Sequence, residues 1–108
     1  MTFGSSWCLD CRAETPLLEE LHQKNSDLVM PSVDSNEAAD VVQDYVDESC
    51  ITYPVLLDCN GSINRLYEVI VIPIGLFIDS DGVIRAKIVD KVTPEILEEK
   101  LPLIGVDL

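Results

Sequence analysis

Two cysteines near the start of the chain are the groups best suited to covalent chemistry. Cys8 and Cys11 form a C-x-x-C pair directly after Trp7. Two thiols at this spacing can close a disulfide, and one can attack a foreign disulfide while the other resolves the mixed disulfide that results. The pair therefore predicts thiol-disulfide exchange, while half of a metal site and an incidental pair remain alternatives.

A structural zinc site is the main metal-binding alternative for these cysteines. A zinc ribbon needs a second close C-x-x-C pair or histidines at matching spacing. Cys50 and Cys59 lie far downstream with eight residues between them, and His22 is the only histidine. The sequence therefore predicts no metal site, and no other cofactor is expected.

The residues after the second cysteine indicate how the pair is positioned. Three leucines recur at helical spacing among glutamates between residues 11 and 23, which predicts an amphipathic helix. A C-x-x-C pair that opens a helix has its first cysteine at the N-terminus, where free backbone donors and the helix dipole stabilise a thiolate. Cys8 is therefore the predicted nucleophile and Cys11 the resolving thiol, with Trp7 as a flat apolar surface for a partner chain.

The remaining patterns alternate between strand and helix. An Asp/Gly-rich turn between two apolar runs predicts an antiparallel hairpin, and a Thr-Pro-Glu sequence predicts the start of a last helix. Strands are predicted at 28–33, 54–57, 74–79 and 83–89, and helices at 34–47, 63–67 and 94–101. This order predicts an α/β fold, with a mixed sheet flanked by helices.

Size and charge limit the classes of function. A chain of 108 residues fits one domain, and its formal net charge of -13 would repel nucleic acids and anionic membrane surfaces. No apolar run approaches the roughly 20 residues that span a bilayer. We therefore expect no nucleic-acid partner and no membrane contact by this chain itself.

The segment Phe3–Pro16 contains the pattern W-C-x-x-C-R-x-E-x-P and resembles the active-site segment of the TlpA/ResA-like branch of the thioredoxin superfamily. Residues 51–58, 67–73 and 76–84 resemble later segments of that branch in the same order. The resemblance implies a single thioredoxin-like domain over residues 1–108. It also implies a protein-disulfide oxidoreductase, whose partners are protein disulfide substrates and a redox partner protein.

The resemblance assigns roles to three further residues. It implies that Pro73 is cis and lies beside the cysteine pair, with the backbone around Ile72 pairing with a bound substrate strand. An ordinary trans-proline at a strand start is the alternative. Glu37 falls near an acid that faces the active site in this branch, where it could transfer a proton. Its alternative role is to cap the next helix in a capping box with Asp34.

The chain departs from the family at its front. Thioredoxin domains place a long apolar strand before the cysteine motif, but only Met1, Thr2 and Phe3 precede Gly4 here. The central strand is therefore expected to be largely missing, and the chain to be either N-terminally truncated or completed by another segment or subunit. The resemblance implies an extracytoplasmic location if the start is truncated, and a cytoplasmic one otherwise.

Other departures bear on redox behaviour. Asp10 lies between the cysteines, where its charge should disfavour a Cys8 thiolate, so we expect a reductant. Cys50 and Cys59 are expected to be passengers, with a second disulfide or a regulatory role as the alternative. The competing functional hypothesis is a non-enzymatic thioredoxin-like binding module or an inactive fragment of a longer protein.

Overall fold

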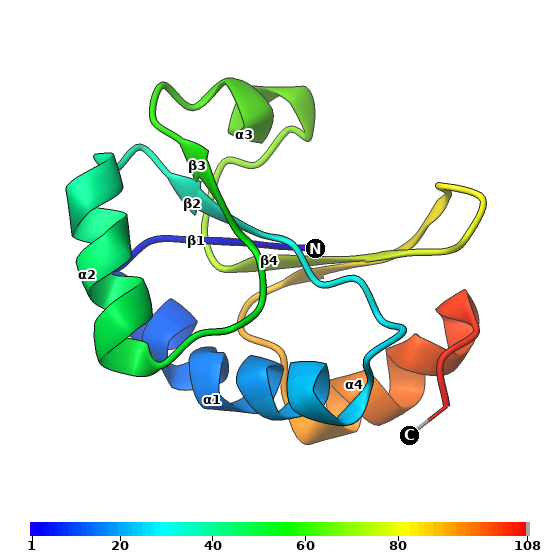
Figure 1. The fold of residues 1–108 in the computed structure, drawn as a ribbon. Coiled ribbons are helices and arrows are strands. Elements are labelled where there is room, and N and C mark those ends of the chain that lie inside the picture. Colours follow the sequence, from blue (N-terminus) through cyan, green and yellow to red (C-terminus); the bar gives the residue numbers. More distant parts are fainter. Residues whose placement is uncertain (108) are drawn as a thin grey trace.

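The computed structural model describes residues 1–107, which form a mixed five-stranded sheet in the order β3-β2-β1-β4-β5 with helices on both faces (Figure 1). This arrangement confirms the α/β class expected from the alternating patterns. The strands are β1 (Thr2–Gly4), β2 (Ser32–Ser35), β3 (Val55–Asp58), β4 (Ile74–Ile78) and β5 (Ile84–Val89). The helices are α1 (Leu9–Lys24), α2 (Ala39–Ser49), α3 (Ser62–Leu66) and α4 (Pro94–Lys100), followed by a 3-10 helix at Leu101–Ile104.

The strand that was expected to be largely missing is present as the three residues of β1. It lies at the centre of the sheet, parallel to β2 and antiparallel to β4. Phe3 is its central residue, is fully buried, and lies opposite Val33 on one side and Ile74 on the other. The sheet is therefore continuous through its middle, and β1 leads directly into the cysteine motif.

The strand predicted at residues 28–33 begins only at Ser32. On one side β1 begins at Thr2, which pairs with Ser32, and on the other side Pro54 has no N–H with which to extend the ladder. Residues 28–31 instead line an apolar cavity of about 410 Å³, which also reaches Met1 and the end of β4. The cavity therefore lies beside the centre of the sheet, next to the start of β1.

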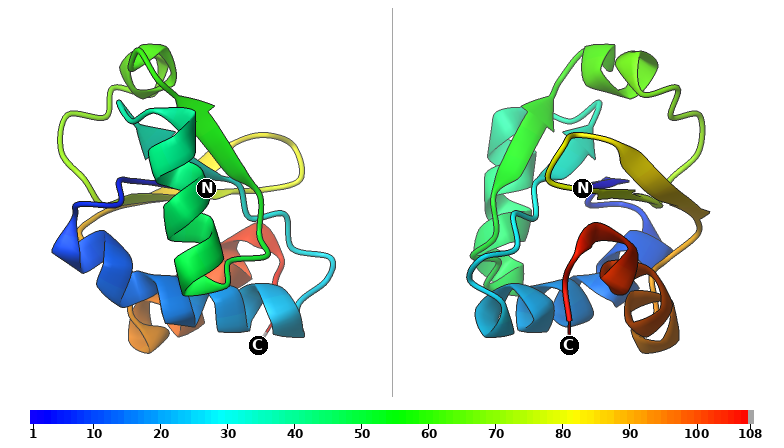
Figure 2. Two further views of the ribbon diagram at one scale, coloured as in Figure 1. Left: turned by 60° about the vertical axis from the view of Figure 1, so that its left-hand side comes forward. Right: turned by 90° about the vertical axis from the view of Figure 1, so that its right-hand side faces the viewer.

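Each face of the sheet has its own core. Figure 2 shows α1, α2 and α4 gathered around one face and α3 on the opposite side. The larger core contains side chains of α1, β4 and α4, of the segments that follow α1 and α2, and of the segments that flank α4: Leu18, Leu21, Met30, Ile51, Tyr53, Phe77, Val92, Leu97 and Leu101. The smaller core consists of Phe3, Val33, Ile74 and Leu76, with side chains of α3 and the following loop packed against it.

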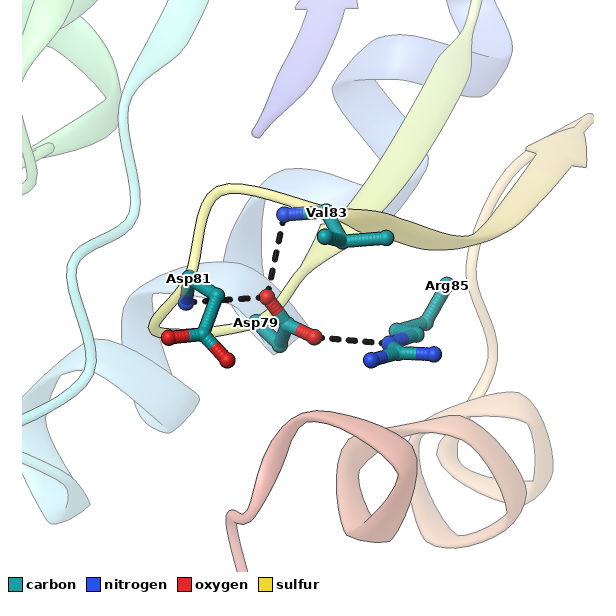
Figure 3. A network of polar contacts seen from close by, with 4 residues as sticks. All are labelled: Asp79, Asp81, Val83 and Arg85. Carbon is teal, nitrogen blue, oxygen red and sulfur yellow. Dashed lines mark hydrogen bonds and ion pairs between the residues drawn. The ribbon is translucent and has the colours of Figure 1, made fainter.

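The predicted hairpin is confirmed, and one carboxylate organises its turn. Asp79 accepts hydrogen bonds from the backbone N–H of Asp81 at 2.9 Å and of Val83 at 3.0 Å (Figure 3). Its other oxygen accepts from the Nε of Arg85 at 2.6 Å. The turn therefore gains its local order from a side chain at the end of β4.

The second helix starts five residues later than its pattern predicts. Asp34 lies within β2, in register with Leu57 of β3, and Asn36 then adopts a left-handed φ of 57°. The N-cap of α2 is Ala38, which has no side-chain capping bond. The predicted capping box of Asp34 and Glu37 is therefore wrong, because sheet pairing holds Asp34 in extended backbone.

Within residues 1–107, none of the helices combines the length and the hydropathy that crossing a membrane requires.

Candidate active site

The cysteine pair lies at the N-terminus of α1. Cys8 is the N-cap residue, and its Sγ accepts a hydrogen bond from the backbone N–H of Cys11 at 3.2 Å. A disulfide joins the two residues, whose Cα atoms are 5.2 Å apart. The structure thus places Cys8 at the positive end of the helix dipole, where a thiolate formed on reduction is stabilised by backbone donors.

Exposed apolar side chains flank this disulfide. Trp7 is 69% exposed and Leu9 is 83% exposed, whereas each of the two cysteines is only 7% exposed. Large apolar side chains this accessible are suited to contact with another chain. The disulfide therefore lies just below a surface formed by its own sequence neighbours.

Cys11 is packed against the central strand. A Cβ atom added to Gly4 would lie 3.1 Å from the Cys11 Sγ. Phe3 pairs with Ile74 in an antiparallel register, so one step further along the strands brings Pro73 opposite Gly4. The Ile72–Pro73 peptide bond is cis, as the resemblance implied. Pro73 and the cysteine pair are therefore both neighbours of Gly4 in β1. The half-buried Ile72 packs against the smaller core.

Glu37 holds the loop that leads into the cysteine motif. Its carboxylate accepts from the backbone N–H of Ser6 at 2.6 Å and from the Ser6 hydroxyl. Burial alone would raise the pKa of Glu37, but hydrogen bonds from Asp34 and Ser6 outweigh it and lower that pKa. Of its two expected positions, Glu37 therefore takes the one facing the active-site loop and does not cap α2.

Asp34 is a second acid behind this loop. It is 4% exposed, and burial, followed by the hydrogen bond with Glu37 and the Glu37 charge, raises its pKa to about 8. Asp34 also lines a small cavity together with Cys11, Glu14 and Tyr45. A buried carboxyl group that stays protonated at neutral pH therefore lies close to the dithiol.

Glu14 is a third acid, and it lies on the inner side of α1. It is 5% exposed, and its Oε2 accepts from the backbone N–H of Val92 at 2.8 Å. Burial raises the pKa of Glu14 to about 7, against the lowering effect of the Val92 bond and with smaller increases from the Asp90 and Asp10 charges. Glu14 is thus poised to exchange a proton near neutral pH.

Sequence reasoning did not identify Asp34 or Glu14 as site residues. A signal for Glu14 was available, because it follows Cys11 by three residues and so shares its helix face. Nothing local marked Asp34, because its position depends on the pairing of β2 with strands on both sides. Cys50 and Cys59 are exposed free thiols that are not joined to each other, so the alternative of a second disulfide between them is wrong for this structure.

Residues 1–87 match the family model described as the AhpC/TSA family. This chain belongs to the AhpC/TSA family. Over 103 residues it is 32% identical to thiol-disulfide oxidoreductase ResA of Bacillus thuringiensis subsp. konkukian (strain 97-27), a match that covers 94% of this chain and 60% of that protein. The chain thus spans less than two thirds of the length of this relative.

Solved structures extend the likeness of this AhpC/TSA-family chain. The crystal structure of StoA from Bacillus subtilis superposes with a TM-score of 0.81 at 25% identity, covering 91% of this chain and 77% of StoA. A putative thiol:disulfide interchange protein DsbE from Chlorobium tepidum shares the fold, with a TM-score of 0.87 at 21% identity over 95% of this chain and 76% of that one. The comparisons confirm the resemblance to thioredoxin-like proteins of the ResA type.

Proposed function

We propose that this chain is a thiol-disulfide oxidoreductase that exchanges disulfides with partner proteins through Cys8 and Cys11, and that it acts as a reductant. The observation that carries the proposal is the position of Cys8 as the N-cap of α1 in a disulfide with Cys11. The names of relatives such as ResA support the same activity.

The proposed reaction has two exchange steps. In the reduced protein, the Cys8 thiolate attacks one sulfur of the substrate disulfide, forms a mixed disulfide and releases the other substrate sulfur as a thiolate. Cys11 then loses its proton and attacks Cys8 Sγ, which closes the Cys8–Cys11 disulfide and releases the second substrate thiolate. Two electrons pass to the substrate, and a dithiol on a redox partner protein restores the reduced pair.

Other residues support these steps. Glu14 shares the small cavity with Cys11, so we assign to it the proton that Cys11 loses. Trp7 provides the exposed apolar surface for the partner chain. The backbone around Ile72, next to Pro73, is proposed to pair with an extended segment of the substrate.

A non-enzymatic binding module is the second candidate, and one observation favours it. The cavity of about 410 Å³ beside Met1 is predominantly apolar, and residues 28–31 and the end of β4 line it. A chain whose role is to bind a partner could use this space without any exchange at the cysteines.

Thiol trapping separates the two candidates. The protein is equilibrated with dithiothreitol redox buffers, quenched with an alkylating reagent and analysed by mass spectrometry, with Cys8→Ser as the matched variant. A reversible two-electron transition confined to Cys8 and Cys11, in which Cys8 is alkylated first, supports the oxidoreductase. Thiols that react slowly and never form a defined disulfide exclude it and leave the binding module.

A further inference from the structure

Ser6 joins the active-site loop to the rest of the fold, next to Ser5, whose hydroxyl donates to the Ser35 carbonyl oxygen at 3.0 Å. The Ser6 backbone N–H and hydroxyl both donate to the Glu37 carboxylate, and the Ser6 carbonyl oxygen accepts from Arg12 Nη1 at 2.7 Å. Ser6 directly precedes Trp7 and Cys8. The contact with Glu37 therefore holds the residue that directly precedes the Trp7–Cys8 segment.

Glu37 is oriented in turn by Asp34. Their carboxyl groups hydrogen-bond to each other, which requires one of them to carry a proton. The buried Asp34 has the raised pKa and the half-exposed Glu37 the lowered one, so Asp34 is the donor. The second oxygen of Asp34, Oδ1, is buried and has no hydrogen-bond partner. Asp34 therefore acts on its surroundings chiefly through Glu37.

We propose that Asp34 is a positioning residue for disulfide exchange: in its protonated form it donates to Glu37, and Glu37 thereby fixes Ser6 and the Trp7–Cys8 segment. The role in exchange rests on the proposed function of Cys8 as nucleophile. Ionisation of Asp34 places two carboxylates against each other, so Glu37 turns away and the loop is released.

The groups that face Asp34 limit what else could produce this pH dependence. From α1 they are Cys11 and Glu14, and from α2 Tyr45, which line the same small cavity. Tyr53, which precedes β3, lines it too, and burial raises the pKa of its hydroxyl above the ordinary value. The β1 strand contributes only Thr2, Phe3 and Gly4, none of which titrates. On the β3 side, Asp58 accepts from backbone donors at the start of α3. Glu14 is therefore the acid whose titration must be separated from that of Asp34.

Trp7 reports directly on the loop because it is the only tryptophan. The experiment follows Trp7 fluorescence anisotropy from pH 6 to 9.5 in the oxidised protein, in which neither Cys8 nor Cys11 can titrate. The expected result is a fall in anisotropy with a midpoint near pH 8, the pKa of Asp34. Asp34→Asn should abolish this transition, because its amide still donates to Glu37 but cannot ionise. A transition that persists in Asp34→Asn overturns the proposal.

Glu14→Gln is the matched control for this titration. It removes the other acid of the cavity while leaving Asp34 and Glu37 in contact, so the transition near pH 8 should remain. If Glu14→Gln removes the transition instead, Glu14 controls the loop and the role assigned to Asp34 is wrong.

Exchange kinetics test the consequence for chemistry. At pH 6.5, the second-order rate constant of the reduced protein with glutathione disulfide should fall about tenfold in Asp34→Ala and return to within about twofold of the parent value in Asp34→Asn. If Asp34 had only a structural role, restoring a hydrogen-bond donor in Asp34→Asn would not restore the rate constant. Equal rates in Asp34→Ala and the parent overturn the proposal.

A second variant covers the case in which Asp34→Ala does not fold. Ser6→Ala leaves the buried carboxyl pair intact and removes only the hydroxyl contact with Glu37, so at pH 6.5 Trp7 anisotropy should be lower than in the parent. Unchanged anisotropy in Ser6→Ala contradicts the proposal. If the parent itself fails to react with glutathione disulfide, the oxidoreductase function fails, while the Trp7 titration still decides whether Asp34 positions the loop.

Discussion

Gly4 and Cys11 are in close contact where the central strand meets the active-site helix. A Cβ atom on Gly4 would lie 3.1 Å from the Sγ of Cys11 and 3.2 Å from its Cβ. Cys11 cannot easily move away in the oxidised protein, because its backbone belongs to α1 and its sulfur is bonded to Cys8. A methyl group at position 4 would therefore require the disulfide or its surroundings to shift by a few tenths of an ångström.

Gly4→Ala should make the disulfide easier to reduce. The added methyl group overpacks the oxidised form, at a cost of about 1 to 3 kcal/mol, whereas a reduced Cys11 can rotate its sulfur away. The equilibrium with dithiothreitol should therefore shift toward the dithiol by about fivefold or more. Thiol trapping across a series of redox buffers measures this shift.

Gly75→Ala is the control for this substitution. Gly75 lies in β4, and its added Cβ would be 3.4 Å from a side-chain atom of Val92, which is ordinary van der Waals contact. This variant should leave the dithiol equilibrium unchanged. An equal shift in both variants would mean that general strain in the sheet, rather than contact with Cys11, changes the reducibility.

Glu14→Gln should remove part of the pH dependence of stability. The folded pKa of Glu14 is about 7, above its ordinary value of 4.5, so the folded state binds more protons between these values. The stability contributed by the protonated form is present below pH 4.5 and is lost as the pH rises through 7. The difference in the free energy of unfolding between the variant and the parent should therefore change with pH. It should favour the variant by roughly 2 to 3 kcal/mol more at pH 8 than at pH 4.5.

Urea unfolding of both proteins at pH 4.5 and pH 8 measures that difference. Comparing variant with parent at each pH cancels the contributions of the other titrating groups. Glu98→Gln, which removes an exposed acid, serves as the control for the loss of one negative charge. If the two variants show the same change between pH 4.5 and pH 8, general charge repulsion explains the effect and burial of Glu14 does not.

Features coded by neighbouring residues were predictable from the sequence. The C-x-x-C pair at a helix start, the hairpin around Asp79 and the N-cap at Thr93 each depend on residues within a few positions, and each is present in the structure. In α4, for example, Thr93 accepts from the backbone N–H of Ile96 at 3.3 Å, as the Thr-Pro-Glu sequence predicts.

Features that depend on distant residues were not predictable in this way. Glu14 meets its backbone partner Val92 across 78 positions, so no local pattern could indicate the contact or the raised pKa. Asp34 and Glu37 have the spacing of a helix start, but pairing with β3 keeps Asp34 in the sheet. At these residues strand pairing outweighs the local preference for a helix cap. Glu37 therefore contacts the active-site loop and does not cap α2.

Asp10→Asn should make the dithiol pair more oxidising. Asp10 is exposed in the first turn of α1, between the cysteines, where its charge disfavours a thiolate on Cys8. Removing the charge stabilises the reduced form, so the reduction potential should rise by about 10 mV. The alkylation rate of Cys8 by iodoacetamide at pH 7 should increase about twofold.

Salt and a remote control test whether the Asp10 effect is electrostatic. The increase in alkylation rate should shrink in 1 M salt, where the screening length falls to about 3 Å. Asp27→Asn removes an exposed charge beyond the far end of α1 and should change neither quantity. The electrostatic explanation is wrong if the increase persists in 1 M salt.

Cys50→Gly should stabilise the fold. Cys50 is the C-cap of α2 and has a left-handed backbone with a φ of 55°, which costs a residue with a Cβ atom about 1 kcal/mol relative to glycine. Its side chain is exposed, so the substitution removes little packing. Thermal unfolding monitored by circular dichroism should therefore give a higher Tm, corresponding to a gain of about 1 kcal/mol. Cys50→Ala also removes the thiol but keeps the Cβ atom, so it should give no comparable gain. If both variants gain equally, loss of the exposed thiol explains the stabilisation and relief of the left-handed backbone does not.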